Sequence, residues 1–341
     1  MREIFRQAVG IDVSQDELVV ILGRLYSDFQ VEFTADRSFA NNQSGFKALL
    51  SYAGKFANGL PIQYAMEATG VYHEQLAYFL SDHQVAVSVI LPNKISNYFR
   101  TLEVKTITDK TAAQAIALFA LERRLEPWSK PQRIFRTLKQ LIRERGQLID
   151  ERTMQKNQLH SEKAEKYPSM ESIRRIEART ALINSQIKEI QQEIDQAIKE
   201  DDSLLKKIQP LLSIPGVGKL TAVTIIAETN GFELIRNKRQ LVSYAGLDVI
   251  EKTSGTSVRG KKKISKKGNR HIRKAMYMPA LAAIRQETRF KHIYARLIAK
   301  HGIRMKAAVA IQRKMLELIF ILWKSQQHYN PDFKNQMAES N

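Results

Sequence analysis

Near its N-terminus the chain reads QAVGIDVS at residues 7–14, an apolar run with the carboxylate of Asp12 in its middle. An apolar run of this length, followed by a polar stretch, predicts a strand buried in a sheet. A charged acid in such a strand costs on the order of several kcal/mol unless something pairs with it. Asp12 therefore predicts either a functional carboxylate or a cap, turn or salt-bridge residue, and for one acid alone the second interpretation is favoured.

Two further acids lie in comparable settings. Glu67 ends the apolar run IQYAM at residues 62–66, and Asp109 opens a helix-like segment at residues 109–117. Acids delivered from a first strand, a later strand and a helix can converge on divalent metal, and two-metal phosphodiester chemistry needs such a set. Asp12, Glu67 and Asp109 are therefore candidate metal ligands.

The order of elements around these acids predicts a mixed sheet covered by helices. Near-alternating apolar residues predict three strands at 8–13, 18–25 and 29–33. They are followed by a helix at 43–56, a strand at 62–66, a helix at 72–82, a strand at 85–91 and helices at 93–100 and 109–124. This order matches the ribonuclease-H-like fold.

A long helical region follows the Pro-rich break PWSKP at residues 127–131. Between residues 134 and 208 an isoleucine seam recurs at spacings of 7, 4, 3 and 4, which is typical of a coiled coil; it comprises Ile176, Ile183, Ile187, Ile190 and Ile194. Pro168 interrupts the helix and predicts an antiparallel hairpin with its tip there. We expect a dimerisation arm or a nucleic-acid clamp, and a plain intramolecular spacer is the alternative.

A glycine-rich turn, PGVG at residues 215–218, separates two apolar helical segments. This pattern is typical of a helix-hairpin-helix, in which Gly216 and Gly218 allow close approach and the amides beside Lys219 can bind a phosphate. A tight helix–helix corner without a ligand is the alternative interpretation.

Charge is unevenly distributed along the 341 residues. Residues 1–130 hold 13 Lys/Arg and 14 Asp/Glu, whereas residues 131–341 hold 41 and 21, so the net charge of +19 comes from the C-terminal part. A basic region of this size indicates a polyanionic partner, and nucleic acid is favoured over an anionic membrane because no strongly amphipathic basic helix with an aromatic face stands out.

The composition excludes several classes of protein. With no cysteine the chain has no disulfide, no cysteine-ligated zinc and no thiolate catalysis. No apolar run approaches about 20 residues, and no secretory signal pattern opens the chain. We expect a soluble, cytoplasmic protein. Its seven histidines show no metal-ligand spacing, and no phosphate-binding loop of the Gly-x-x-x-x-Gly-Lys-Ser/Thr type is present.

A small flexible segment containing Ser254 leads into the strongest cation run of the chain. Residues 259–274 hold nine Lys/Arg and no acid. Cations here would neutralise phosphate charge, and a serine hydroxyl could attack phosphorus. On composition alone, a solvated loop that grips phosphate nonspecifically is the favoured interpretation. The expected nucleic-acid contacts are Gly216, Gly218, Lys219, Arg259, Lys261, Lys262, Lys263, Lys266, Lys267, Asn269, Arg270 and Arg273.

Several motifs together resemble the IS110 family of insertion-sequence transposases. The N-terminal set is GIDVS at 10–14, MEATG at 66–70 and TDKTAA at 108–113, which are similar to the RuvC-like domain of that family. The C-terminal set is PGVGKLTA at 215–222, YAGL at 244–247, SG at 254–255 and KKGNRHIR at 266–273. The two sets span nearly the whole chain in the family's order.

The resemblance implies an RNA-guided DNA recombinase that moves its own element. It implies an element-encoded structured RNA that pairs with donor and target DNA, and a homotetramer built as a dimer of dimers. From the composition we expect no membrane partner. The resemblance also implies that Asp12, Glu67 and Asp109 bind Mg²⁺ and that Ser254 is the nucleophile of a covalent phosphoserine intermediate. Ser257 is a weaker candidate, because it is Ser254 that occupies the Ser-Gly pair.

The chain departs from the family pattern at one position. The pattern Thr-Asp-x-x-Asp-Ala has a fourth acid where this chain has Ala112. Residues three apart on a helix share a face, so that acid would lie beside Asp109, and its loss should weaken binding of at least one Mg²⁺. Either three acids suffice, or this is a weakened or inactive form, natural or engineered.

The sequence therefore predicts four segments. They are an α/β RuvC-like (ribonuclease-H-like) metal-binding domain at 1–128, a coiled-coil helical hairpin at 129–208, a mostly α-helical serine-bearing domain with a helix-hairpin-helix at 209–330, and a flexible tail at 331–341. Two other functions stay open: a metal-dependent junction-resolving endonuclease without a covalent intermediate, and a non-enzymatic architectural nucleic-acid-binding protein.

Overall fold

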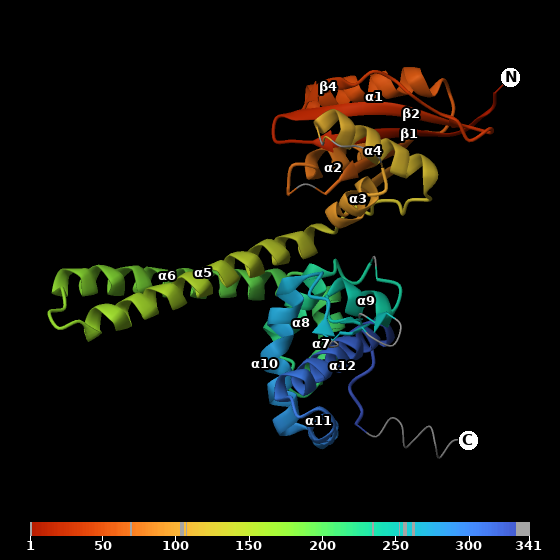
Figure 1. The fold of residues 1–341 in the computed structure, drawn as a ribbon. Helices are drawn as coiled ribbons and strands as arrows, with labels where there is room; N and C mark the ends of the chain where they lie inside the picture. The colour runs from red at the N-terminus through yellow and green to blue at the C-terminus, as the bar shows by residue number, and fades with distance from the viewer. Residues whose placement is uncertain are drawn as a thin grey trace, which may run out of the picture. The chain divides into compact units, whose positions relative to one another are not determined.

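The computed structural model of the chain describes residues 2–331 apart from 69, 103–105, 107, 234, 252, 255–257, 261 and 262. For residues 253, 254, 258 and 259 the backbone alone is described. The chain divides into two compact units, Met1–Lys130 and Pro131–Asn341 (Figure 1). Within the described residues, no helix combines the length and the apolar composition needed to cross a bilayer.

The first unit is built on a six-stranded mixed sheet. Its strand order is β3-β2-β1-β5-β6, with β4 paired to β2. Antiparallel ladders join β1 to β2 and β2 to β3, whereas β5 runs parallel to β1 and β6 parallel to β5. The strands are β1 (Ile4–Val13), β2 (Glu17–Tyr26), β3 (Val31–Phe33), β4 (Arg37–Ala40), β5 (Gln63–Glu67) and β6 (Val87–Ile90). The mixed α/β architecture is confirmed, with the strand order of a ribonuclease-H-like fold.

Helices cover both faces of this sheet. Side chains alternate along a strand, so Val9 and Ile11 point to one face and Ala8 and Gly10 to the other. The first face packs on α1 (Gln43–Ala57) and α2 (Glu74–Asp82), and the second packs on α3 (Pro92–Phe99) and α4 (Asp109–Glu122). Each face has its own apolar core, which explains the nearly continuous apolar sequence of β1.

Two features of the sheet differ from the sequence-based expectation. β1 begins at Ile4 rather than at the predicted residue 8. The first residues of the strand were not predicted because polar side chains interrupt the apolar pattern there. Gln7 among them is buried, donates to the carbonyl of Ala57 at 3.1 Å and accepts from Arg24 at 3.1 Å. β4 was missed altogether, because it is a short edge strand with mostly exposed side chains that pairs with the start of β2.

The second unit starts with a long helical hairpin. Its helices are α5 (Arg133–Ala164) and α6 (Met170–Lys199), and Pro168 lies in the connection between them (Figure 1). The expected hairpin is therefore present. All five isoleucines of the predicted seam are buried on α6, facing a stripe of α5 that includes buried Leu138. Whether the helices supercoil as a coiled coil stays a prediction.

Helices of the C-terminal part pack around the root of the hairpin. They are α7 (Asp202–Leu212), α8 (Lys219–Glu228), α9 (Lys238–Tyr244), α10 (Arg270–Gln286), α11 (Thr288–His301) and α12 (Arg304–Ser325). One apolar core joins Leu138 and Ile194 of the hairpin to Ile226, Met276 and Ile319 of these helices. The expected boundary between residues 208 and 209 thus falls inside one unit, and a mostly helical C-terminal part is confirmed.

Candidate functional site

Asp12 and Glu67 occupy the carboxyl ends of two adjacent parallel strands. β1 and β5 pair in the register Gly10 to Ala65 and Ile11 to Met66, and the next step along each strand reaches Asp12 and Glu67. Ligand sites in sheets of this kind form beyond the carboxyl ends of parallel strands. Both carboxylates are half-buried, so the fold presents two acids at one edge of the sheet.

The third acid is brought to this edge by an unusually close helix. Gly10 faces α4, and a Cβ at Gly10 would overlap the carbonyl oxygen of Ala113 and lie 2.7 Å from the Cβ of Ala117. Asp12 lies two residues further along β1 and so shares the face that contacts α4. Asp109 stands in the first turn of α4, after the N-cap Thr108, whose side chain accepts from the amide of Thr111 at 3.2 Å.

Asp12 is electrostatically coupled to each of the other two carboxylates. Burial raises the pKa of the Asp12 carboxyl, and the negative charge of Asp109 raises it further, although a hydrogen bond from the amide of Val13 lowers it. Burial, together with the charge of Asp12, also raises the pKa of Glu67. Like charges held together in this way disfavour ionisation, and a cation between them would reverse that effect.

The donor chemistry of this cluster fits a divalent cation. Carboxylate oxygens are the ligands that hard cations such as Mg²⁺ prefer. Within the described ranges, however, no three acidic or histidine side chains are close enough to hold a metal ion as they stand. The acids would have to draw closer to share an ion.

Ala112 lies on the same helix as Asp109, one turn further along, and is half-buried. Its amide donates to the carbonyl of Thr108 at 2.8 Å, so α4 is regular at this point. A side chain at position 112 would extend beside Asp109, because residues three apart lie on one face of a helix. The helix is therefore compatible with a fourth carboxylate that this sequence lacks.

Ser254 lies on a small antiparallel ribbon in the second unit. β8 (Thr253–Ser254) pairs with β9 (Val258–Arg259), and β7 (Val249–Ile250) pairs with β10 (Lys263–Ile264) on the side of the ribbon nearer the helices. Ser254 is thus towards the tip. The weaker candidate Ser257 and the expected contacts Lys261 and Lys262 lie outside the described residues, and for Arg259 only the backbone is described.

Two sequence motifs meet at the root of this ribbon. Gly246 and Gly268 both have positive φ, +67° and +156°, and a Cβ at Gly268 would lie 2.6 Å from the amide of Gly246. The amide of Lys266 donates to the carbonyl of Gly246 at 3.0 Å, and the amide of Asn269 donates to the carbonyl of Tyr244 at 2.7 Å. The YAGL and KKGN segments therefore form one backbone junction from which the ribbon projects.

The remaining expected nucleic-acid contacts fall into two groups. Lys263, Lys266, Lys267 and Arg270 are exposed, as a phosphate-binding surface requires. A second group is already engaged within the protein: Arg273 donates to the carbonyls of Ala245 and Gly268 at 2.7 and 3.0 Å, and Lys219 pairs with Asp195 of α6.

Gly216 and Gly218 differ in their surroundings. Gly216 has a φ of +85°, and a Cβ there would lie 2.6 Å from the carbonyl oxygen of Pro279 on α10, so glycine is needed for packing. Gly218 is the N-cap residue of α8, and a Cβ at this position would meet no atom within 4 Å. The turn between α7 and α8 is present, whereas a ligand-binding helix-hairpin-helix stays a prediction.

A buried carboxylate that no sequence pattern singles out organises this region. Glu228, the last residue of α8, is 2% exposed. It accepts from Nε and Nη2 of Arg143 on α5 at 2.8 and 3.0 Å, and from Asn269 at 2.7 Å. Asn269 in turn caps α10 by accepting from the amides of His271 and Ile272. Burial acts to raise the pKa of Glu228, yet these hydrogen bonds and the charges of Arg143 and Lys139 hold it below its ordinary value.

A second cationic surface was also missed. Residues 252–316 hold 19 Lys/Arg and one acid, Glu287, so the cation-rich segment extends far beyond residue 274. Its later part includes the exposed side chains of Arg289, Lys291, Arg296 and Lys300 on α11. The absence of acids between residues 288 and 316 was a signal available in the sequence.

Comparison with known proteins matches both parts of the chain. Residues 9–164 match the family profile DEDD_Tnp_IS110, described as a transposase, and residues 208–295 match a profile described as the transposase IS116/IS110/IS902 family. The pilin gene-inverting protein of Moraxella bovis is 28% identical over 289 residues, covering 83% of this chain and 87% of that protein.

Other similarities are shorter or weaker. The transposase for insertion sequence element IS1111A of Coxiella burnetii is 31% identical over 148 residues, which are 40% of this chain and 40% of that protein. Among solved structures, T. thermophilus RuvC in complex with a Holliday junction substrate matches 36% of this chain and 99% of that chain, with a TM-score of 0.28 and 11% identity.

Proposed function

This chain belongs to the IS110 family of insertion-sequence transposases, and from that membership we propose that it is an RNA-guided DNA recombinase acting through a phosphoserine. Ser254 is the nucleophile, and Asp12, Glu67 and Asp109 hold Mg²⁺. The observation that carries the metal site of this proposal is geometric: Asp12 and Glu67 lie at the carboxyl ends of adjacent parallel strands, and Asp12 is on the face of β1 that contacts α4, the helix that carries Asp109.

Asp12, Glu67 and Asp109 would hold the metal through their carboxylate oxygens. When bound, the metal would supply positive charge against the phosphate that is cut. The protein positions the three carboxylates. Asp12 and Glu67 lie at the ends of two paired strands, and the close contact of Gly10 with α4 determines how near Asp109 lies to the sheet. With Ala112 in place of a fourth acid, we expect weak metal binding and slow chemistry in this chain.

Ser254 performs the covalent step. Its hydroxyl oxygen loses its proton and forms a bond to phosphorus, while the bond from phosphorus to the 3′ oxygen breaks and that oxygen takes a proton. The product is a phosphoserine and a free 3′ hydroxyl. Attack by a 3′ hydroxyl of the partner strand reverses these changes and releases the serine, so rejoining needs no further reactant.

Exposed cations beside the ribbon bind the phosphates around this serine. Lys263, Lys266, Lys267 and Arg270 are exposed on its base and at the start of α10, and Arg259, Lys261 and Lys262 belong to the same run of sequence. Cations in such positions neutralise backbone charge and stabilise the charge that develops at the reacting phosphorus.

The RNA and the assembly are proposed from the resemblance to the family and not from the geometry. We propose that a structured RNA pairs with donor and target DNA and that four copies assemble as a dimer of dimers. The division into a metal domain, a hairpin arm and a serine-bearing domain suits such an assembly, since acids and serine lie in different units of the chain.

The nucleophile is tested with labelled DNA, Mg²⁺ and the copurifying RNA on a denaturing gel. Wild type should give a protein–DNA adduct, and Ser254→Ala should give none. Ser257→Ala is the matched control and should retain the adduct. An adduct that persists in Ser254→Ala, or disappears in Ser257→Ala, would show that Ser254 is not the nucleophile.

The same gel separates the proposal from its rivals. A metal-dependent junction-resolving endonuclease would cut DNA in Mg²⁺ without any adduct in either variant, and Asp12→Asn would abolish cutting. An architectural binder would give neither an adduct nor cut strands on this gel, and in a native binding assay it would bind DNA equally with and without Mg²⁺. RNA guidance fails if no defined RNA copurifies, or if removal of that RNA leaves recombination unchanged.

A further inference from the structure

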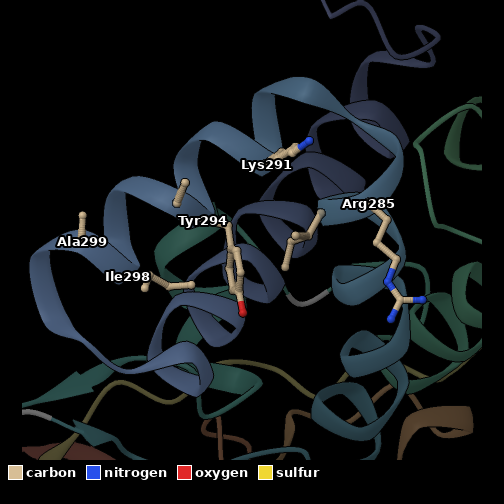
Figure 2. A pocket seen from close by; sticks show the side chains of 7 residues that line it. Arg285, Lys291, Tyr294, Ile298 and Ala299 are labelled. Carbon is tan, nitrogen blue, oxygen red and sulfur yellow. The ribbon is translucent and has the colours of Figure 1, made fainter.

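A groove lies between the end of α10 and the length of α11, and none of its lining residues belongs to the ribbon that carries Ser254. Its volume is about 710 Å³. α10 contributes Ile284 and Arg285, and α11 contributes Lys291, Tyr294 and Ile298, together with two alanines. In Figure 2, Tyr294 projects between Ile298 on one side and Arg285 on the other.

The lining of the groove follows a helical stripe. The α11 residues occur at positions 291, 294, 295, 298 and 299, which share one face of a helix. Tyr294 and Ile284 pack against the apolar core with part of their surface exposed. Ala295 and Ala299 add little bulk, so space remains beside the Tyr294 ring. The groove thus offers one aromatic ring, aliphatic walls and no buried charge.

Cations border this apolar surface. Arg285 and Lys291 line the groove and are exposed, and neither forms an ion pair with any of the described residues. The single acid in this part of the chain, Glu287, accepts from the amide of Arg289 at the start of α11. The surface around the groove is therefore complementary to a polyanion.

An aromatic ring with aliphatic walls and bordering cations matches an unpaired nucleotide. A base can stack on the ring once it has left its own duplex, and the phosphates on either side of it can contact the cations. A fully paired duplex offers the phosphates but keeps its bases out of reach. Apolar protein partners would gain nothing from the cations.

We propose that this groove binds an unpaired nucleotide of a DNA strand, with the base on Tyr294 and its phosphates at Arg285 and Lys291. The inference rests on the proposed function, because strand exchange exposes unpaired DNA. It adds a site for the separated strand that is distinct from the acids and from Ser254.

The test compares two DNA duplexes of equal length, one fully paired and one with a gap of about four unpaired nucleotides. Fluorescence anisotropy with the full chain, without divalent metal, reports affinity and not cleavage. Tyr294→Leu should bind the gapped duplex roughly tenfold more weakly (about 1.4 kcal/mol) and the paired duplex unchanged. Tyr294→Phe, which keeps the ring, should bind both like wild type.

Two controls separate stacking from other effects. Tyr167→Leu makes the same replacement at the exposed hairpin tip and should change neither affinity. Abasic sites in the gap should weaken wild-type binding to the level of Tyr294→Leu. Replacing Arg285 and Lys291 with Gln should reduce the slope of log affinity against log salt by about 1.4 on the gapped duplex, about 0.7 for each single-strand phosphate that is no longer neutralised.

The outcomes distinguish this inference from the proposed function. Equal gapped-duplex affinities for Tyr294→Leu and wild type would overturn the groove assignment and leave Ser254 chemistry untouched. The groove assignment would also be overturned if the protein bound a duplex whose unpaired nucleotides are RNA more tightly than one whose unpaired nucleotides are DNA, and if Tyr294→Leu removed that difference. The groove would then be assigned to RNA. Failure of the adduct test for Ser254, with the Tyr294 effect intact, would overturn the chemistry alone.

Discussion

Gly10 of β1 and Ala113 of α4 are so close that a Cβ on Gly10 would overlap the Ala113 carbonyl oxygen. This contact determines how near the first turn of α4, with Asp109, can come to the strand that carries Asp12. The geometry of the acid cluster therefore depends on the absence of one methyl group.

Gly10→Ala should push α4 away from the sheet and destabilise the first unit. Overpacking of a core typically costs about 1–3 kcal/mol, and backbone atoms cannot yield as a flexible side chain can. Urea unfolding measures the loss. Gly54→Ala is the control, because a Cβ there meets nothing within 4 Å and helix propensity favours alanine by about 0.5–1 kcal/mol. Equal stabilities for the two variants would contradict the close-contact argument.

Ala112→Asp should restore a fourth carboxylate beside Asp109 and tighten Mg²⁺ binding. One additional carboxylate–cation interaction is worth at least about 1 kcal/mol even in water, so the metal concentration for half-maximal recombination should fall about fivefold or more. A rise in Tm on adding Mg²⁺ gives a second readout. Ala112→Asn, which adds similar volume without charge, is the control. If Ala112→Asp behaves like Ala112→Asn, three acids suffice in this chain.

Glu228 should make the stability of the second unit depend on pH. Its pKa is lowered in the folded protein, so the stabilisation is fully present above the unfolded value of about 4.3 and is lost as pH falls through the folded value. Glu228→Gln should cost about 2 kcal/mol at pH 7 and flatten the decline of urea midpoints between about pH 5 and pH 3. Glu177→Gln, at an exposed ion pair with Lys163, should change little. If the urea midpoint of Glu228→Gln fell with pH as steeply as that of wild type, Glu228 would not be the source of the pH dependence.

Gly216 and Gly218 form a matched pair. Gly216→Ala combines a positive φ with a clash against Pro279, so it should destabilise the second unit by about 1–3 kcal/mol. Gly218→Ala should cost less than about 1 kcal/mol as an N-cap change. Thermal unfolding and duplex binding are measured together. If Gly218→Ala weakens duplex binding at unchanged stability, the turn contacts phosphate. If binding is unchanged, it is a helix–helix corner.

Much of the first unit could be predicted from local sequence. Apolar alternation indicated the central strands, and the order of elements indicated the sheet, because both depend on neighbouring residues. The isoleucine seam similarly predicted α6 and its buried face. β4 could not be predicted, since its exposed residues carry no apolar pattern and its pairing with β2 is what makes it a strand.

Polar contacts between residues far apart in the chain could not be predicted from the sequence. Glu228 follows an apolar helix, and its partners lie 85 residues earlier at Arg143 and 41 residues later at Asn269. No spacing rule connects such positions. Asn269 was predicted to contact nucleic acid because it lies in a basic run, yet its side chain caps α10 and donates to Glu228. Asp12, Glu67 and Asp109, by contrast, could be chosen from their local settings, and their role as metal ligands stays a prediction.

The bond between Arg143 and Glu228 has a mechanical consequence for the hairpin. Arg143 lies near the root of α5, and the helix continues to Ala164, about 32 Å further at a helical rise of about 1.5 Å per residue. The apolar core that includes Leu138 and Ile194 also holds the root of the hairpin, so Arg143 is one of several anchors. A tilt of about 10° of α5 at Arg143 would move the tip by about 5–6 Å over this length, so the direction of the arm depends on how firmly these anchors hold its root.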